Sequence, residues 1–263
     1  MEMTIMQAIV FGIVQGVTEF LPISSSGHIV LAQYFFGIED PQMSFVFALH
    51  MGSLLAVVMY FWRDWLNLVH IKKDMKVYQD NPHLLWLIVV ATIPSVAVGL
   101  FIGDFVENLV FSKVVVAFLI LCGSVVLFVC DRIFSKKRTL KHINVKNSFI
   151  IGLFQIVALI PGVSRSGMTI SGARMCGFNR VDAARFSFLI SVPIIIGAGI
   201  LMIKSAVFSE FTVQVFVGTV ASFIVSICTI HYFLALIRKV SYAIFLYYSI
   251  VFFIITCCVV YLG

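Results

Sequence analysis

The sequence predicts an all-α integral membrane protein with an inverted-topology repeat, built from six transmembrane helices and two re-entrant helical hairpins. Three observations support this prediction: the composition, a series of long apolar runs, and a polar segment that occurs twice. Of the 263 residues, 61% are hydrophobic and only 11% are charged, whereas soluble domains are about 45–50% apolar and about 25% charged. The mean hydropathy of +1.09 agrees with this. A soluble fold is therefore excluded.

Six apolar runs are long enough to cross a membrane, since about 20 helical residues span a hydrocarbon core of about 30 Å. They lie at 43–62, 84–103, 114–130, 186–203, 211–237 and 240–263. Their hydrophobicity is continuous rather than alternating, which excludes a membrane β-barrel. Because only helices and closed barrels satisfy the backbone in lipid, each run is predicted to be a transmembrane helix.

Two shorter apolar segments are interrupted in a way that ordinary spans are not. Residues 4–18 run into Glu19, and residues 148–160 run into Pro161 and Arg165. Each is followed by a Ser- and Gly-rich stretch, ISSSGH in the first and VSRSGMT in the second, and then by another short apolar piece. Broken helices at membrane depth are tolerated where their backbone is buried in protein or lines a wet cavity. We therefore predict two re-entrant hairpins whose tips meet inside the bilayer.

The basic residues indicate the orientation of these elements, because Lys and Arg concentrate in cytoplasmic loops. They gather in the connections at 63–83, 131–147 and 238–239. The opposite connections contain just two basic residues, Lys113 and Lys204. Both termini and the first hairpin are therefore predicted on the outer face, and the second hairpin enters from the cytoplasm. These loops also explain the net charge of +6, so a nucleic-acid partner is excluded.

The polar segment that occurs twice indicates an internal repeat. Residues 11–30 align without a gap with residues 151–170, which lie 140 positions further along. The identical pairs include Gly12/Gly152, Gln15/Gln155, Val17/Val157, Ser24/Ser164, Ser26/Ser166 and Gly27/Gly167. We therefore predict one membrane domain, 1–263, made of two repeats, 1–134 and 147–263. Each repeat holds a hairpin and three crossings, and this odd number inverts the second repeat. Inverted repeats place the functional site at their interface near the midplane.

The two hairpins carry polar side chains that suit an anion. A charge near the bilayer centre costs about 2.5–3.5 kcal/mol, so Glu19 and Arg165 need each other, a ligand or a wet cavity. The hydroxyl, amide and imidazole groups around them belong to Gln15, Ser24, Ser25, Ser26, His28, Ser164, Ser166 and Thr169. Gln15 and Glu19 share one helical face at i, i+4 spacing. Hydroxyl donors, Gly-rich backbone and a guanidinium together predict a phosphate-binding site.

Phosphoryl transfer needs such a site, because its transition state spreads charge over oxygens that must be held and neutralised. Either Ser25 or His28 could attack phosphorus. Glu19 could orient the imidazole, activate the nucleophile or help to hold a divalent cation. A secondary transporter or lipid flippase is the alternative, since inverted repeats and broken helices are common in carriers. The nucleophilic Ser and His side chains favour hydrolysis over pure transport.

The segments QGVTEFLPISSSGH and PGVSRSGMT resemble the two signature motifs of the bacitracin-resistance type undecaprenyl-diphosphatases. The similarity continues through ALHMGSLLAVVMYF, ATIPSVAVGL and ARFSFLISVP, so that it covers essentially the whole chain. The resemblance implies hydrolysis of undecaprenyl diphosphate to undecaprenyl phosphate and inorganic phosphate at the outer face of the bacterial plasma membrane. This reaction recycles the lipid carrier for cell-wall synthesis and confers bacitracin resistance.

The same resemblance implies roles for individual residues. It assigns catalysis to Glu19, Ser25, His28 and Arg165. It places around the diphosphate Gln15, Ser24, Ser164, Ser166 and Thr169, and Ser26 completes the predicted substrate-binding set. It also implies a divalent cation, Mg²⁺ or Ca²⁺, with Glu19 as a ligand, although Gln15 stands where other members have Glu. The expected partners are a polyprenyl diphosphate and membrane lipids. A homodimer is compatible with the sequence, which leaves the oligomeric state open.

Several other polar residues receive structural interpretations. His50 lies in the middle of a predicted span and is interpreted as a polar helix-packing residue. Arg174, Arg180 and Arg185 follow the second hairpin and are interpreted mainly as interfacial anchors. A site of the phosphatidic acid phosphatase type is excluded, because the residues after Ser164 and Arg165 lack that family's SRxxxxxHxxxD motif.

Overall fold

The computed structural model describes residues 3–38, 43–68, 83–107, 111–134, 138–204 and 212–262. These residues are mainly helical, and the extended pairing among them is one isolated bridge between Arg138 and Phe178. Five described helices are long and apolar enough to cross a membrane, or six if a pair bent by 70° counts as one span. The prediction of an all-α membrane protein is therefore confirmed, with five or six spans.

The helices follow the order in which the apolar runs predict them. The first half contains α1 (Ile5–Thr18), α2 (Ser25–Phe36), α3 (Met43–Tyr60), α4 (Trp62–Leu68), α6 (Leu84–Glu107) and α7 (Lys113–Ile133). A 3-10 turn, η1 (Leu140–His142), precedes α8 (Val145–Val157), α9 (Arg165–Met175), α10 (Arg180–Lys204), α11 (Val213–Ile237) and α12 (Ala243–Leu262). The bend between α3 and α4 is the one that leaves the span count at five or six. Most of the predicted basic loop at 63–83 and of the connection at 204–210 lies outside the described residues.

The two interrupted segments form helix pairs, α1–α2 and α8–α9. Both second helices begin at a serine that caps the helix, which satisfies a free amide of the first turn. The Ser24 Oγ accepts from the Gly27 amide at 3.4 Å, and the Ser164 Oγ accepts from the Gly167 amide at 3.1 Å. Ser24 adopts a positive φ of 70°, so the chain turns sharply before α2 starts. The two hairpins predicted from the Ser- and Gly-rich breaks are thus formed by short capped helices.

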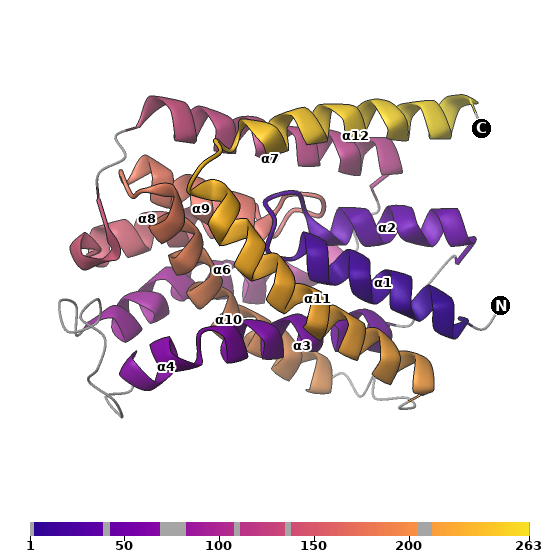
Figure 1. Ribbon diagram of the computed structural model, residues 1–263, viewed down its shortest axis with the longest axis horizontal. Coiled ribbons are helices and arrows are strands. Elements are labelled where there is room, and N and C mark those ends of the chain that lie inside the picture. Colours follow the sequence, from indigo (N-terminus) through magenta and orange to yellow (C-terminus); the bar gives the residue numbers. More distant parts are fainter. Residues whose placement is uncertain are drawn as a thin grey trace.

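Close helix contacts hold the first hairpin in place. The helix α1 lies against α11, α11 against α3, α8 against α6, and α7 along α12 at one side of the molecule (Figure 1). A Cβ added at Gly12 would lie 2.4 Å from the Gly218 carbonyl oxygen, and one at Gly16 would lie 2.8 Å from the Ser222 carbonyl oxygen. These two positions therefore require glycine, because any side chain would force α1 away from α11.

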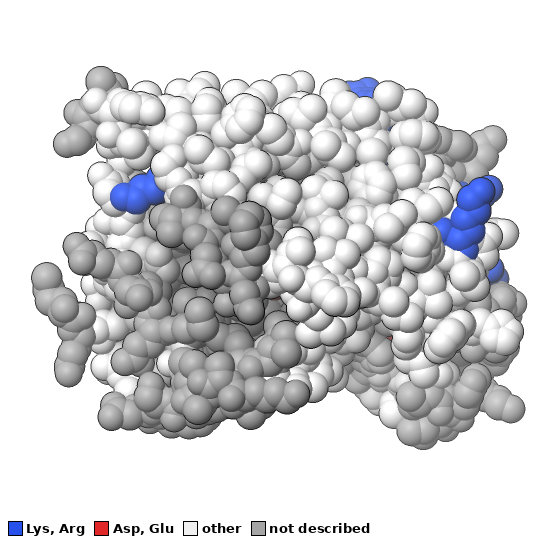
Figure 2. Space-filling view, turned by 180° about the vertical axis from the view of Figure 1, so that it is seen from behind, with Lys and Arg blue, Asp and Glu red and all other residues white. Residues whose placement is uncertain are grey.

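The exterior and the interior of the molecule differ in the way expected for a protein in lipid. Large apolar side chains are exposed on several helices, with Phe101 on α6 and Phe216 on α11 among them. Among the described residues on the face in Figure 2, few are basic and almost none is acidic, and the Lys and Arg lie toward its edges. Aromatic rings pack inside, where Phe188 lies 5.2 Å from Phe20 and 5.8 Å from Phe233 between ring centroids.

The three arginines that follow the second hairpin form ion pairs within the protein. Arg174 is fully buried, and both its Nε and Nη2 lie 2.9 Å from Asp131 Oδ1. The Arg180 Nη2 lies 2.8 Å from Asp131 Oδ2, and the Arg185 Nη2 lies 2.7 Å from an oxygen of Asp64. The interpretation of Arg174 as an interfacial anchor was therefore wrong, because its carboxylate partner lies on α7, 43 positions away.

Candidate active site

The tips of the two hairpins touch each other, as predicted. The Ser166 Oγ donates to the Leu21 carbonyl oxygen at 2.9 Å. The Arg165 Nη2 donates to Glu19 Oε1 at 2.6 Å. Arg165 is the first residue of α9, and Glu19 is the cap residue that ends α1. The ends of two short helices therefore bring together the two charges that the sequence places in the hairpins.

Glu19 is the centre of a hydrogen-bond network. Its Oε2 accepts from Ser25 Oγ at 2.7 Å and from Gln15 Nε2 at 2.9 Å. The Gln15 Nε2 also lies 2.8 Å from His50 Nδ1, which is itself 3.4 Å from Glu19 Oε2. Since the other carboxylate oxygen accepts from Arg165, both oxygens have donors. A carboxylate held this way is rigid and can receive a proton from Ser25 without moving.

A cavity of about 390 Å³ opens beside this network. Six of the predicted site residues line it: Glu19, Ser24, Ser25, Ser26, Ser164 and Arg165. Helices α3 and α10 supply the other walls, with Val46, Phe47 and His50 from α3. The Arg165 side chain is 18% exposed, and its buried Nη1 has no hydrogen-bond partner among the described residues. The guanidinium thus has a hydrogen-bonding group that the described part of the protein does not use.

The comparisons with known proteins identify the family of this chain. The protein family described as bacitracin resistance protein BacA matches residues 8–255. The chain belongs to this family. A relative from Desulforudis audaxviator named undecaprenyl-diphosphatase is 42% identical over 244 residues, which is 93% of each chain. Relatives with the same name from Moorella thermoacetica and Caldicellulosiruptor bescii are 41% and 40% identical, over 94% of this chain and 95% and 94% of theirs.

The resemblance of the two hairpin motifs to this family is therefore confirmed. The matched range begins within α1, includes the rest of both hairpins and reaches into α12. The similarity thus covers nearly the whole chain and is not confined to one motif.

The remaining predicted site residues of this BacA family member do not line the pocket. Gln15 is buried behind Glu19. Ser166 bonds the opposite hairpin tip, and the Thr169 Oγ1 lies 2.6 Å from Ser187 Oγ. These hydroxyls hold α9 against its neighbours.

His28 faces another direction from Ser25, although both belong to α2. Its Nδ1 donates to the Ser24 carbonyl oxygen at 2.7 Å, and its Nε2 lies 2.6 Å from the Tyr248 hydroxyl. Its ring packs on Phe252 with centroids 4.4 Å apart. His28 is not among the residues that line the pocket. The structure thus brings Ser25, and not His28, into contact with Glu19.

His50 is the residue that the interpretation of the sequence undervalued. It was interpreted as a packing residue, yet it lines the pocket and contacts both Gln15 and Glu19. The available signal was its position, since an ionisable residue in the middle of an apolar span is a candidate functional residue. His50 lies outside the repeated segment, so the internal repeat does not indicate it as a site residue.

The side chains around Glu19 include few groups that could hold the implied divalent cation. No group of three or more His, Cys, Asp or Glu that could hold a metal ion occurs within the described ranges. Glu19 and His50 form a pair, but both Glu19 oxygens already accept from protein donors. Mg²⁺ is usually bound through one or two carboxylates together with substrate phosphates and water. Within the described residues, Glu19 and His50 alone are thus too few ligands for a cation held by the protein by itself.

Proposed function

We propose that this chain hydrolyses undecaprenyl diphosphate to undecaprenyl phosphate and inorganic phosphate, and that the pocket between the hairpins is its active site. One observation carries the proposal: Glu19 accepts from the Ser25 hydroxyl on one oxygen and from Arg165 on the other, beside a cavity. The names of the relatives supply the substrate. The reaction returns the lipid carrier to cell-wall synthesis, and bacitracin resistance follows from it.

Ser25 is the proposed nucleophile. Its hydroxyl proton passes to Glu19 over the 2.7 Å hydrogen bond while Oγ attacks the terminal phosphorus. The Oγ–P bond forms, the bond from that phosphorus to the bridging oxygen breaks, and undecaprenyl phosphate leaves. Water then attacks the phosphoserine, and Glu19 returns the proton to Oγ as the O–P bond breaks. Both hydrogens of the water leave with the inorganic phosphate.

Arg165 is the proposed electrostatic stabiliser of this transfer. Its Nη2 holds Glu19, and its Nη1 is available to phosphate oxygens on which negative charge accumulates. The pocket hydroxyls of Ser24, Ser26 and Ser164 are the proposed further donors. His28 is assigned a positioning role, because its bond to the Ser24 carbonyl oxygen braces the start of α2.

The divalent cation, Mg²⁺ or Ca²⁺, belongs to the same proposal. Glu19 is its proposed protein ligand, with diphosphate oxygens and water completing the coordination. When bound, the cation neutralises charge on the diphosphate. Removal of divalent cations with a chelator should lower phosphate release, and adding back Mg²⁺ or Ca²⁺ should restore it.

We also propose that the two halves of the chain are inverted repeats with the site facing the outer side of the plasma membrane. The matching caps of α2 and α9 support the repeat. In each hairpin the capping serine lies beside the serine two positions on, at 3.2 Å for Ser24 and Ser26 and at 3.1 Å for Ser164 and Ser166. The distribution of basic loop residues supports the orientation. Labelling of single cysteines at the hairpin tips from either side of sealed vesicles tests it.

Phosphate release by the purified protein tests the function. The wild type should release inorganic phosphate from undecaprenyl diphosphate, and during turnover it should carry label from the terminal phosphate on Ser25. The variant Ser25→Ala should do neither. Ser148→Ala is a matched control, because the buried Ser148 hydroxyl on α8 has no hydrogen-bond partner in the described part of the chain. If the undecaprenyl diphosphate instead crosses the vesicle membrane and is recovered without hydrolysis, the protein is a transporter.

A further inference from the structure

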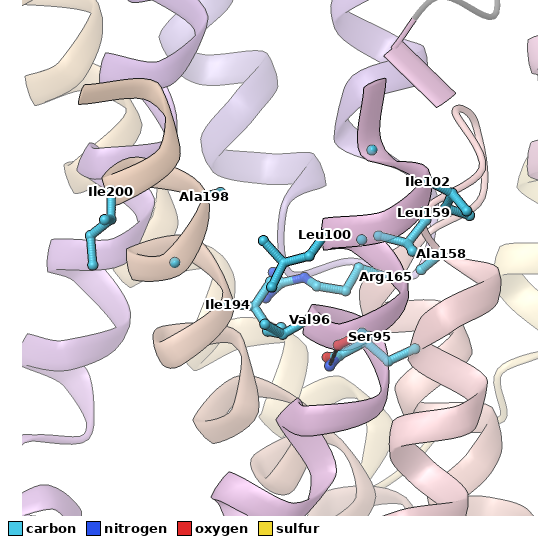
Figure 3. Close-up of a pocket in the computed structure, with 14 residues that line it drawn as sticks. Ser95, Val96, Leu100, Ile102, Ala158, Leu159, Arg165, Ile194, Ala198 and Ile200 are labelled. Carbon is cyan, nitrogen blue, oxygen red and sulfur yellow. Dashed lines mark hydrogen bonds between the residues drawn. The ribbon is translucent and has the colours of Figure 1, made fainter. Parts of the chain in front are cut away.

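A cavity lined by arginines lies apart from the pocket between the hairpins. The cavity beside that pocket, between α6, α8 and α10, is lined mainly by apolar side chains, and its charged lining residue is Arg165 (Figure 3). The arginine-lined cavity has a volume of about 290 Å³ and shares no lining residue with the pocket between the hairpins. Three arginines and no acidic residue are among the described residues that line it: Arg174, Asn179, Arg180, Val181, Ile237 and Arg238. We call it the arginine pocket.

Positive charge exceeds negative charge around the arginine pocket. The Arg174 Nη2 lies 2.9 Å from Asp131 Oδ1 and the Arg180 Nη2 lies 2.8 Å from Asp131 Oδ2, so two guanidiniums share one carboxylate. The Asp131 side chain is 1% exposed, whereas that of Arg180 is 23% exposed. Asp182 does not line the pocket, and it accepts from the Asn179 side chain at 2.8 Å. The negative charge is therefore more deeply buried than the positive charge around it.

Arg238 supplies hydrogen-bond donors that no described residue uses. Arg174 and Arg180 direct their donors at Asp131 and at backbone carbonyl oxygens. Arg238 is the exposed cap residue that ends α11, and its guanidinium forms no hydrogen bond or ion pair with the described residues. A guanidinium carries five N–H donors in a planar fork that matches two oxygens of a phosphate. The arginine pocket thus combines excess positive charge with donors suited to a phosphate.

The arginine pocket lies at the ends of two helices that are long and apolar enough to cross a membrane. Arg180 begins α10 and Ile237 ends α11. The ends of transmembrane helices lie at the depth of the lipid headgroups. The basic connections at 131–147 and 238–239 belong to the same end of the molecule, which their charge predicts to be cytoplasmic. Basic pockets between transmembrane helices on that side bind the headgroups of anionic lipids.

An exposed apolar ridge leads along α11 to Arg238. Ile224, Tyr232 and Leu236 are 55%, 70% and 37% exposed, and Cys228 between them is exposed as well. Successive members are four positions apart, so they form one ridge on the helix. From 224 to 236 the helix rises about 18 Å, which is close to the thickness of one hydrocarbon leaflet, about 15 Å. An acyl chain that lies along this ridge places its headgroup phosphate beside Arg238.

We infer that the arginine pocket binds the phosphate of an anionic phospholipid, with an acyl chain against the ridge on α11. The site is separate from the proposed hydrolysis, because the two pockets share no lining residue. A zwitterionic phospholipid fits less well, since it brings a cationic group to a pocket with excess positive charge. Inorganic phosphate has a suitable charge but makes no contact with the ridge, so it binds more weakly than the lipid.

Native mass spectrometry of the full-length protein in detergent measures this binding. Delipidated protein is titrated with phosphatidylglycerol, with phosphatidylcholine and with inorganic phosphate. The wild type should bind one phosphatidylglycerol with an apparent Kd at least about tenfold below that for either of the other two, because each arginine near an anionic lipid strengthens binding by about fivefold. Arg238→Gln should raise the Kd for phosphatidylglycerol by about fivefold.

Arg132→Gln is the matched control. It removes the same charge from an exposed residue at the end of α7, outside the arginine pocket, and it should leave the Kd for phosphatidylglycerol unchanged. Because both arginines are exposed, both variants should keep the wild-type unfolding temperature in detergent alone. A loss of bound lipid in Arg238→Gln then reflects the site and not the fold.

Four outcomes would overturn the inference. An equal loss in Arg132→Gln would mean that the general charge of this end attracts the lipid, and an unchanged Kd in Arg238→Gln would remove Arg238 from any site. Equal affinity for the two lipids would contradict the requirement for an anion. Inorganic phosphate that binds as tightly as phosphatidylglycerol, and depends equally on Arg238, would replace the lipid by a soluble anion.

Discussion

Two of the carboxylate–arginine clusters in the described part of the chain differ in how completely their hydrogen bonds are used. In the cluster of Asp131 with Arg174 and Arg180, the Arg174 Nε and Nη2 bond Asp131 and its Nη1 bonds the Phe178 carbonyl oxygen. Arg180 contacts both oxygens of the same carboxylate.

The cluster of Glu19 and Arg165 is incomplete by comparison. Its Arg165 Nη1 has no partner within the described chain, and the 390 Å³ cavity lies beside it. An unsatisfied buried donor costs free energy, so the second cluster uses its hydrogen-bonding groups less completely than the first, as the proposed function requires of a site that takes an anion. Composition and burial alone would have grouped the two together.

The largest expected effect is on activity, from replacing the arginine of the incomplete cluster. Arg165→Ala should lower kcat/KM for phosphate release by about 10³–10⁵-fold, because it removes the charge that stabilises the transferring phosphoryl group. Arg165→Lys should recover little, since an ammonium cannot hold Glu19 and a phosphate oxygen in the same planar geometry. Kinetics on purified protein together with thermal unfolding measure both effects. Full activity in either variant would remove Arg165 from the site.

The completed cluster should show the opposite behaviour. Arg174→Met should lower the free energy of unfolding by about 3–5 kcal/mol, because it breaks a buried ion pair and leaves the Phe178 carbonyl oxygen without its donor. The activity of the molecules that remain folded should be unchanged. Arg180→Met is the matched control. It should lower the free energy of unfolding by less than Arg174→Met does, since the Arg180 side chain is 23% exposed. A loss of activity without a loss of stability would mean that this cluster also serves the reaction.

The sequence predicted the incomplete cluster better than the completed one, and the reason is physical. Glu19 and Arg165 interrupt apolar segments inside repeated motifs, so the cost of burying each charge required a partner or a ligand. Asp131 lies at the end of a span, beside Arg132 and a basic loop. A charge at that position can be solvated by water or lipid headgroups, so nothing in the sequence indicates a pairing with Arg174.

The helices were predicted more fully than their contacts. Continuous apolar runs locate α3, α6, α7, α10, α11 and α12, because the requirement to satisfy the backbone in lipid acts on each segment separately. The 70° bend between α3 and α4 and the contact of His50 with Glu19 depend on how segments pack against each other. No local pattern in a single sequence contains that information.

The two histidines near the incomplete cluster provide a smaller test. His50→Gln should lower kcat by about tenfold, because the imidazole positions Gln15 and Glu19, and proton transfer is sensitive to such positioning. His28→Gln should have a weaker effect, since His28 contacts the Ser24 backbone and Tyr248 outside the pocket. His231→Gln is the control, as His231 contacts Tyr60 away from the site. A larger loss for His28→Gln would restore His28 to the catalytic role that the family resemblance gives it.

The contact between the hairpin tips should contribute modestly to stability. Ser166→Ala removes the donor to the Leu21 carbonyl oxygen and should lower the free energy of unfolding by about 0.5–1.5 kcal/mol. Because the contact between the tips positions Glu19 against Arg165, Ser166→Ala should also lower kcat. Ser148→Ala should change neither quantity. Stability and kcat of both variants can be measured in the same detergent, and an unchanged Ser166→Ala enzyme would show that the ion pair alone holds the tips together.

The smallest expected effect concerns pH at the edge of the completed cluster. Burial raises the pKa of Tyr242, whose hydroxyl donates to the Arg180 carbonyl oxygen at 3.1 Å. A pKa that is higher in the folded than in the unfolded state gives stability that is present below the unfolded pKa of about 10 and is lost as the pH rises above it. Tyr242→Phe removes this hydrogen bond and should lower the free energy of unfolding by about 1 kcal/mol at neutral pH. It should also make the unfolding temperature fall less steeply above pH 10. Thermal unfolding of both proteins between pH 7 and pH 11 measures this, and parallel curves would show that Tyr242 does not contribute to the alkaline loss.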